Sequence, residues 1–323
     1  MALNERTLIE RFFRDCGARR SDVPLGVGDD AALLESPAGM QLVAAVDTLV
    51  SGNHFLPHFP ADSIGHRSLA VNLSDLAAMG AEPAWALLAL TLPSADENWL
   101  AGFASGLDAI ARQHNVALVG GDTTRGPLCI TVQLLGYAPR PPVMLRSGGR
   151  PGHVLFVSGT PGDAAAGLAI ELRQLDAANA EAGAWLRQRF MFPTPRVELG
   201  KKLRSYASSC IDVSDGLLGD AGRLAEASGC GVVMAHERLP VSPQLVACAG
   251  DERAREYTLT GGEAYELCFA VPPESVERLT RDLPPRQWGY TQIGELVASA
   301  GARVTRGGTV MDFSHSGWDH FAA

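Results

Sequence analysis

The sequence predicts a two-domain protein of the α/β or α+β class, for three reasons. Its 323 residues are enough for two domains of about 150 residues each. Strand-like apolar segments alternate with helix-like segments in both halves of the chain. The stretch at 138–152, APRPPVMLRSGGRPG, holds four prolines and three glycines, which favours a connection. We therefore expect an N-terminal domain over 1–140 and a C-terminal domain over 141–323.

Three helices are expected in the first half. Asn4 is a candidate N-cap for a helix that ends near Gly17. Asp62 is placed to cap a helix over about 63–79, and Asp96 to cap the next one. The strands expected between these helices are LGVGDDAALL, QLVAAVD, PAWALLALTLP, VALVGGD and LCITVQLLGY.

The second half repeats the alternation of strands and helices. Helices are expected over 162–175, 217–228 and 273–281, with Asp215 as N-cap of the second. A short hairpin is expected around Arg306-Gly307-Gly308. The expected strands are HVLFVSG, SCIDVSDG, GCGVVMA, AYELCFAVP and WGYTQIGELV.

Charge and cysteine usage exclude several classes of protein. Lys and Arg number 27 against 36 Asp and Glu, which gives a formal charge of −9. A protein with an extensive basic surface for nucleic acid is therefore not expected. The six cysteines are scattered without a C-x-x-C pair, as in proteins with reduced thiols. The N-terminus is charged, and the longest apolar stretch is too short to span a bilayer. We expect a cytoplasmic protein that binds neither nucleic acid nor membrane.

Aspartates recur at the ends of the expected elements, next to Gly, Ser or Thr. Each alone is explained by turn or capping chemistry, but their repetition favours a site for hard cations. Mg²⁺ takes carboxylate, phosphate and water oxygens, so a polyphosphate is the natural ligand of such a site. The segments are Gly28-Asp29-Asp30, Asp47-Thr48, Ser74-Asp75, Gly120-Gly121-Asp122 and Asp212-Val213-Ser214-Asp215-Gly216.

Two of these segments carry more information than the others. The helix over 63–79 is apolar on nearly all sides, so Asn72 and Asp75 share a buried face. A buried Asp75 needs either a cation or hydrogen-bond donors from a neighbouring loop, and both remain open. Strand alternation sends Asp212 and Ser214 to one side, where helix capping does not explain Asp212.

Familiar motifs do not fit. The spacing at Asp212 lacks the EF-hand pattern, and Gly26-Val27-Gly28 lacks the third glycine of a dinucleotide-binding loop. Ser158-Gly159-Thr160-Pro161-Gly162 has no Walker lysine, and neither G-x-S-x-G nor H-E-x-x-H occurs. His54 stands alone, as loop and core histidines usually do.

Taken in order, nine segments resemble the thiamine-monophosphate kinase family. That family is similar in fold to aminoimidazole ribonucleotide synthetase and transfers the γ-phosphate of ATP to thiamine monophosphate. The segments are GVGDDAALL, VDTLVSGNHF, HRSLAVNLSDLAAMGAEP, LVGGDTTRG, LRSGGRPG, SGTPGDAAAGL, IDVSDGL, LTGGEAYELCF and SGWDHF.

The resemblance implies a set of site residues. Contacts to ATP would come from Gly121, Asp122, Arg146 and Ser214, and contacts to thiamine monophosphate from His54, Glu263 and Trp318. Family members often carry hydroxyl residues just before the position of Asp47, whereas this chain has Ala45 and Val46. At these two positions, any metal ligand would have to be a backbone carbonyl oxygen. The implied ligands of several Mg²⁺ ions are Asp30, Ala45, Val46, Asp47, Asp75, Asp122, Asp212 and Asp215.

The resemblance also implies a mechanism and an assembly. The acceptor phosphate is largely deprotonated at pH 7, so direct in-line transfer needs no general base. A homodimer is implied, with strands of the N-terminal domain pairing across it and the nucleotide in the cleft.

Other families and classes fit the sequence less well. Selenophosphate synthetase and the hydrogenase carbamoyl-dehydrating protein are disfavoured because the cysteines that they require are missing. Aminoimidazole ribonucleotide synthetase matches the first and last motifs less well. A nonenzymatic cation- or nucleotide-binding protein would keep the carboxylates and release no ADP.

Overall fold

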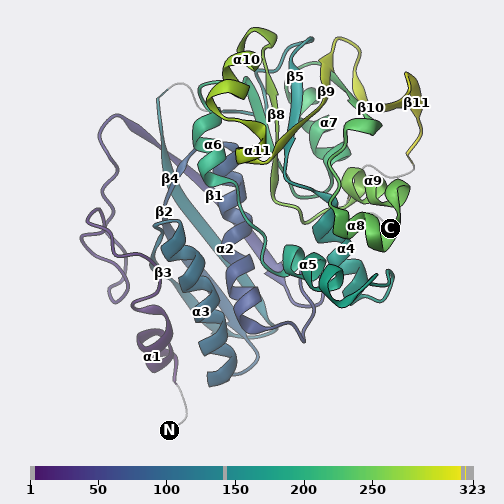
Figure 1. The fold of residues 1–323 in the computed structure, drawn as a ribbon. Helices are drawn as coiled ribbons and strands as arrows, with labels where there is room; N and C mark the ends of the chain where they lie inside the picture. Colours follow the sequence, from purple (N-terminus) through teal and green to yellow (C-terminus); the bar gives the residue numbers. More distant parts are fainter. Residues whose placement is uncertain (1–3, 141–143, 314–316, 318–323) are drawn as a thin grey trace. The chain divides into compact units, whose positions relative to one another are not determined.

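The structure is a computed structural model that describes residues 4–140, 144–313 and 317. It divides into two compact units, one of Met1–Leu76 with Ala81–Pro141 and one of Ala77–Gly80 with Pro142–Ala323. Each unit holds one β-sheet with helices packed against it (Figure 1). The predicted α/β (α+β) class with two domains is confirmed.

The first unit is built on a four-stranded sheet in the order β1-β4-β2-β3. β4 pairs antiparallel with both β1 and β2, and β2 pairs parallel with β3. The helices α2 and α3 lie on one face of this sheet (Figure 1). The bounds are β1 Met40–Val50, α2 Ala61–Ala78, β2 Glu82–Leu92, α3 Glu97–Gln113, β3 Ala117–Arg125 and β4 Cys129–Pro139.

Close backbone contacts hold the helical layer together. A Cβ added to Gly106 of α3 would lie 1.9 Å from the carbonyl oxygen of Asp62 in α2. One added to Gly136 of β4 would lie 2.8 Å from Leu76 Cδ2. Glycine at these two positions therefore lets α3 approach α2 and lets α2 approach the sheet.

Two of the three predicted helix starts in this unit are confirmed. The Asn4 side chain accepts a 2.9 Å hydrogen bond from the Thr7 N–H at the start of α1 (Glu5–Leu8), which continues into the π-helical η1 (Ile9–Phe13). Asp96 accepts from two amides at the start of α3. The cap predicted at Asp62 is wrong, because α2 begins at Ala61 and Asp62 lies inside its first turn.

The segment LGVGDDAALL, predicted as a strand, makes only isolated bridges, Leu25 to Leu33 and Val27 to Asp29. Gly28 has a φ of +126° and turns the chain between them. The strand prediction is therefore wrong here, and the segment is a loop.

The second unit has a seven-stranded sheet in the order β11-β10-β7-β9-β5-β8-β6. All neighbours pair antiparallel except β7 and β10, which are parallel. The hairpin predicted at Arg306-Gly307-Gly308 joins β10 to β11. The bounds are β5 Val154–Ser158, β6 Ser209–Val213, β7 Gly231–Ala235, β8 Glu266–Val271, β9 Tyr290–Val297, β10 Gly301–Arg306 and β11 Thr309–Met311.

Among the described residues of this unit, helices contribute to hydrophobic clusters on and beside the sheet. Leu217 and Leu224 of α7 pack with sheet residues such as Ile211 and Val232. Leu186 of α5 belongs to a second cluster with residues of α4, α8 and α9. The bounds are α4 Gly162–Glu171, α5 Ala180–Met191, α6 Val197–Leu203, α7 Leu217–Ala227, η2 His236–Arg238, α8 Pro243–Ala249, α9 Asp251–Thr260, α10 Pro273–Asp282 and α11 Pro285–Trp288.

None of the helices in the described ranges combines the length and the hydropathy that a bilayer crossing requires.

Candidate functional site

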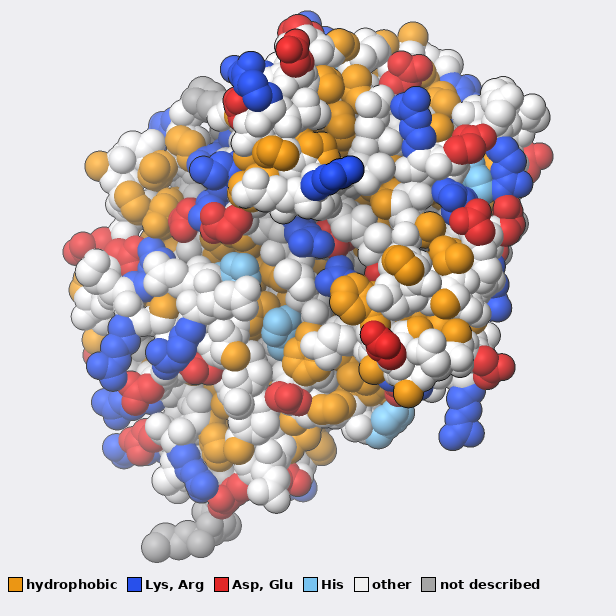
Figure 2. Space-filling view, viewed as in Figure 1, with side chains coloured by type: hydrophobic (Ala, Val, Ile, Leu, Met, Phe, Trp, Pro, Cys, Tyr) orange, Lys and Arg blue, Asp and Glu red, His pale blue; other side chains and the backbone are white. Residues whose placement is uncertain are grey.

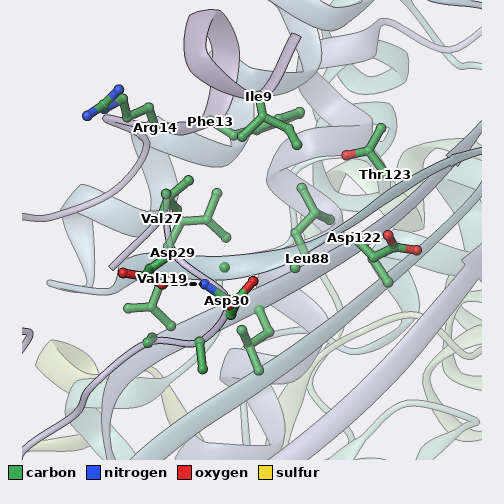
Figure 3. A pocket seen from close by; sticks show the side chains of 18 of the residues that line it. Ile9, Phe13, Arg14, Val27, Asp29, Asp30, Leu88, Val119, Asp122 and Thr123 are labelled. Carbon is green, nitrogen blue, oxygen red and sulfur yellow. Dashed lines mark hydrogen bonds between the residues drawn. The ribbon is translucent and has the colours of Figure 1, made fainter. Parts of the chain in front are cut away.

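A cavity of about 1510 Å³ lies within the first unit (Figure 3). Its walls come from the N-terminal helical segment, including Ile9 and Phe13, and from the loop that carries Asp29 and Asp30. Residues of all four strands complete the lining, among them Asp122. The cavity therefore brings together two of the aspartate segments that the sequence singles out.

A row of directly paired residues crosses the sheet beside this cavity. Thr48 of β1 pairs with Thr131 of β4, Thr131 with Ala89 of β2, and Ala89 with Asp122 of β3. The hydroxyl oxygens of Thr48 and Thr131 are 2.8 Å apart. The row places Asp122 in register with hydroxyl side chains two and three strands away.

The residue before Asp122, Gly121, has to be a glycine. Its φ is +148°, and an added Cβ would lie 1.8 Å from the Leu88 carbonyl oxygen. Only glycine allows β3 to approach β2 so closely at this point, so Gly121 fixes the backbone from which Asp122 projects.

The loop with Asp29 and Asp30, and the chain before it, are held by polar contacts. The Asp30 N–H donates to Asp29 Oδ1 at 2.8 Å. Upstream, Arg20 forms an ion pair with Asp22 at 2.6 Å and lowers the pKa of that carboxyl, and the Trp85 indole also donates to Asp22. No local sequence pattern links Asp22 with Trp85 in β2, so the sequence alone does not predict this contact.

Strand alternation divides the three predicted ligands of β1. Val46 is opposite Gln133, lines the cavity and is 62% exposed. Ala45 and Asp47 are opposite Leu134 and Val132, which are buried beneath the helices. The side chains of Ala45 and Asp47 therefore belong to the helix-covered face of the sheet, and that of Val46 to the open face.

Two further predicted residues lie in the first unit. The surroundings of Asp75 in α2 are buried as predicted, but Asp75 itself is half-buried. His54 follows β1, and its Nδ1 accepts a 3.0 Å hydrogen bond from the Val50 N–H. That bond places the proton of the neutral ring on Nε2.

In the second unit, the DVSDG segment runs from β6 into α7. Asp212, near the end of β6, is buried. The N-cap predicted at Asp215 is wrong: Gly216 occupies that position, and the Asp215 carboxylate accepts from Arg223 at 2.6 Å. Asp220, inside the helix, accepts from the amides of residues 214–216 instead.

The GGE segment continues the β6–β8 ladder beyond its last strand pair. The Glu263 N–H donates to the Ser214 carbonyl at 2.6 Å, and the Tyr265 N–H donates to that of Val213 at 2.8 Å. Glu263 is therefore held beside the DVSDG segment, and the main-chain bonds fix its position.

Gly317, the described residue of the C-terminal motif, lies at the same place. A Cβ added to Gly317 would lie 2.7 Å from the Asp215 carbonyl oxygen, so Gly317 packs directly on this segment. Trp318, the predicted substrate contact, lies outside the described residues. Three segments that are distant in the sequence thus converge in the second unit.

Arg146 lies elsewhere in the second unit. The Arg146 carbonyl accepts a hydrogen bond from the hydroxyl of Ser228, just beyond the end of α7. The carbonyl of the preceding residue, Leu145, accepts from the Cys210 N–H at the start of β6. Ser214 follows the end of β6 and precedes α7. The structure therefore places the backbones of these two predicted ATP contacts at opposite ends of the same strand and helix.

The predicted metal ligands are divided between the two units, with Asp212 and Asp215 in the second and the other six in the first. Among the residues that the structure describes, no three His, Cys, Asp or Glu side chains form a group that could hold a metal ion. The donors in both units are carboxylate and carbonyl oxygens, which are the ligands that Mg²⁺ takes. In their chemistry, the residues present fit this ion.

Acidic and basic side chains are mixed over the face that Figure 2 shows. That face carries no continuous basic area of the kind that binds nucleic acid. The formal charge of −9 agrees with this distribution.

Comparison with known proteins identifies the family. Residues 28–138 match the AIR synthase related protein, N-terminal domain, and residues 150–307 match its C-terminal domain. The thiamine-monophosphate kinase of Salmonella typhimurium is 45% identical over 325 residues, which cover 100% of this chain and 99% of that protein.

Solved structures agree with the sequence comparison. Thiamine-monophosphate kinase from Stenotrophomonas maltophilia K279a superimposes with a TM-score of 0.83 at 41% identity, covering 96% of this chain and 99% of that one. AaThiL complexed with AMPPCP and TMP gives a TM-score of 0.77 at 32% identity, covering 91% and 92%. The chain belongs to the thiamine-monophosphate kinase family, within the AIR synthase related proteins.

Proposed function

We propose that this protein transfers the γ-phosphate of ATP to thiamine monophosphate and releases thiamine diphosphate and ADP. The observation that carries the proposal is the convergence of DVSDG, GGE and Gly317 in the second unit. The relatives named above, one of them solved with AMPPCP and TMP, support the choice of substrates.

Each predicted residue then has a role. Gly121, Asp122, Arg146 and Ser214 would contact ATP, and His54, Glu263 and Trp318 would contact thiamine monophosphate. Bound Mg²⁺ would offset the repulsion between the two anionic phosphates. The residues that would hold these ions are Asp30, Asp47, Asp75, Asp122, Asp212 and Asp215, with the backbone carbonyls of Ala45 and Val46.

Transfer is direct in this proposal. An oxygen of the thiamine monophosphate phosphate attacks the γ-phosphorus while the bond from that phosphorus to the β,γ-bridging oxygen breaks, and ADP leaves with the electron pair. The second pKa of a phosphate monoester is about 6, so the acceptor needs no general base. The aspartates of the site therefore bind ions and do not accept protons.

We also propose that the protein is a homodimer that acts in the cytoplasm. β1 is an edge strand whose open face presents exposed Leu42, Val46 and Val50, an apolar strip that a second copy can cover. The six cysteines are free thiols, as is usual where the surroundings are reducing.

The test is an assay of ADP release with ATP and Mg²⁺, with and without thiamine monophosphate, combined with chromatographic detection of thiamine diphosphate. The proposal expects ADP release that depends on thiamine monophosphate, in a one-to-one ratio with thiamine diphosphate. ATP binding without ADP release would indicate a binding protein instead. Radiolabelled phosphate trapped on the protein during turnover would contradict direct transfer.

A further inference from the structure

Asp220 has an unusual set of hydrogen-bond partners. Its Oδ2 accepts from the backbone N–H groups of Ser214, Asp215 and Gly216 at 3.1, 3.1 and 3.2 Å. Its Oδ1 accepts from Arg223 Nη1 at 2.6 Å. The residue is 1% exposed, so both oxygens are bound inside the protein.

Convergent amides at the start of a helix commonly bind a phosphate group, because the N–H groups and the helix dipole both favour an anion. At the start of α7 the Asp220 carboxylate already occupies that position. A phosphate could replace it only by leaving a buried carboxylate without its three amide donors, which is costly. The amides of residues 214–216 are therefore committed to an internal anion.

Through these bonds, one carboxylate fixes the surrounding segments. Holding the amide of Asp215 fixes the peptide plane that carries the Ser214 carbonyl, and this carbonyl accepts from the Glu263 N–H. Arg223 uses the same nitrogen to bind Asp220 and Asp215, so it also ties the Asp215 side chain to Asp220. Neither link depends on a bound ion.

We propose that Asp220 is a positioning residue, an internal substitute for a phosphate that holds Ser214 and Asp215 in the orientation needed to bind ATP and divalent ions. The proposal rests on the functions proposed above for those two residues. Asp220 itself touches neither substrate nor ion. Residues that orient metal ligands in this way typically change ion affinity about 10- to 100-fold when they are removed.

The experiment uses the full chain and the variants Asp220→Ala and Asp220→Asn. Asp220→Ala leaves the amides of residues 214–216 without an acceptor. Asp220→Asn keeps the side-chain shape and one acceptor oxygen but loses the negative charge. Calorimetric titration with Mn²⁺ in the absence of nucleotide gives the ion affinity, and steady-state assays give KM for ATP and kcat. We expect Asp220→Ala to weaken Mn²⁺ binding and raise KM for ATP by about tenfold or more, and Asp220→Asn to do so by less.

Rescue provides a second readout. Formate carries the carboxylate that Asp220→Ala removes, so adding formate should restore Mn²⁺ affinity in that variant and leave the original protein unchanged. A role limited to stabilising the helix predicts a lower melting temperature with unchanged ion affinity in whatever fraction stays folded.

Asp163→Ala is the matched control. Asp163 is also a fully buried carboxylate in the first turn of a helix of the second unit, and its oxygens accept from the hydroxyls of Thr160 and Ser242. We expect Asp163→Ala to lower the melting temperature and to leave Mn²⁺ affinity and KM for ATP unchanged. If the Asp220 variants show the same pattern as this control, the positioning role is wrong.

The outcomes separate this proposal from the proposed function. If the original protein releases no ADP in response to thiamine monophosphate, the kinase proposal fails, and the Mn²⁺ titrations still decide the role of Asp220. Unchanged Mn²⁺ affinity and unchanged KM in folded Asp220→Asn and Asp220→Ala would overturn the positioning role in an active kinase.

Discussion

The Tyr265 hydroxyl donates a 2.7 Å hydrogen bond to Glu263 Oε2, and both residues have left-handed backbones, with φ values of 51° and 70°. Such conformations are unfavourable for residues other than glycine and cluster at functional sites. Here they let two residues of one short segment direct their side chains at each other beside Ser214. The pair presents Glu263 in one orientation.

Replacing Tyr265 by Phe should therefore weaken the binding of thiamine monophosphate. A hydrogen bond to a charged group contributes about 1.5–3 kcal/mol, so we expect KM for this substrate to rise about tenfold or more while KM for ATP stays within about twofold. Tyr206→Phe is the control, because Tyr206 donates similarly to Asp282 at 3.0 Å outside the proposed site. Equal effects of the two variants on KM would show that Glu263 needs no orientation by Tyr265.

Asp122→Asn should abolish turnover while the fold is kept. The change removes the charge from a proposed ion ligand and keeps its size, so we expect ADP release at limiting Mg²⁺ to fall more than about a hundredfold. Circular dichroism checks the fold, and Asp15→Asn, at an exposed ion pair with Arg19, controls for the loss of one carboxylate. Full turnover of Asp122→Asn at limiting Mg²⁺ would end the assignment of Asp122.

Neighbouring glycines of β3 should respond differently to alanine. An added Cβ at Gly121 meets the Leu88 carbonyl at 1.8 Å, whereas at Gly120 the nearest atom is Leu87 Cδ2 at 3.2 Å. We expect Gly121→Ala to lower the free energy of unfolding by about 2–4 kcal/mol and Gly120→Ala by about 1 kcal/mol or less. Urea titration measures both, and similar values for the two variants would show that the close approach of β3 to β2 is absent.

Exposed apolar side chains of β1 should hold the proposed dimer together. Leu42 is 62% exposed on the open face of the sheet, so Leu42→Glu would place a charge in the contact and should yield monomers. Light scattering after size-exclusion chromatography measures the mass. Leu172→Glu, at a 43% exposed position beyond α4, should leave the dimer intact. A monomeric original protein, or a dimeric Leu42→Glu, contradicts the proposed contact.

Acid should destabilise the protein through His236. Burial and the nearby Arg306 lower the pKa of this histidine, which is 4% exposed. The unfolded state, with a pKa of about 6.5, then takes up the proton first, so the free energy of unfolding falls as pH drops below about 6.5 and levels off below the folded-state pKa. Burial also lowers the pKa of His153, which adds to the same slope.

The variant His236→Asn should therefore flatten the pH dependence. Urea titrations between about pH 7.5 and about pH 5 should give a smaller loss of unfolding free energy in the variant than in the original protein. If the two slopes are equal, the buried His236 does not contribute to acid sensitivity.

Local signals predicted some helix starts and misled at others. Asn4 and Asp96 each bond to amides within three residues, so a sequence pattern is sufficient to find them. Asp215 has the right chemistry for an N-cap, but Gly216 occupies that position, and Asp220 reaches back from inside α7 to the amides of residues 214–216. A carboxylate inside a helix that accepts from the amides before the helix has no pattern that the sequence displays.

The remaining omissions have a tertiary cause. α9 carries few apolar residues, and it is helical because Ala254 packs into a cluster with α4, α5 and α8. The contact of Gly317 with Asp215 and the anchoring of Asp22 by Trp85 join segments far apart in the chain. No periodicity within a segment reports such contacts.

Alternation along β1 has a consequence for how this strand can change. Val46 and Asp47 face opposite sides of the sheet because side chains alternate along a strand, and they pair with Gln133 and Val132. Deleting a single residue upstream of them, without a compensating bulge, would turn Asp47 outward and bring Val46 under the helices. Insertions and deletions in this strand should thus be tolerated only in pairs or beyond its two ends, whereas substitutions at Leu42 or Val50 leave the phase of the strand intact.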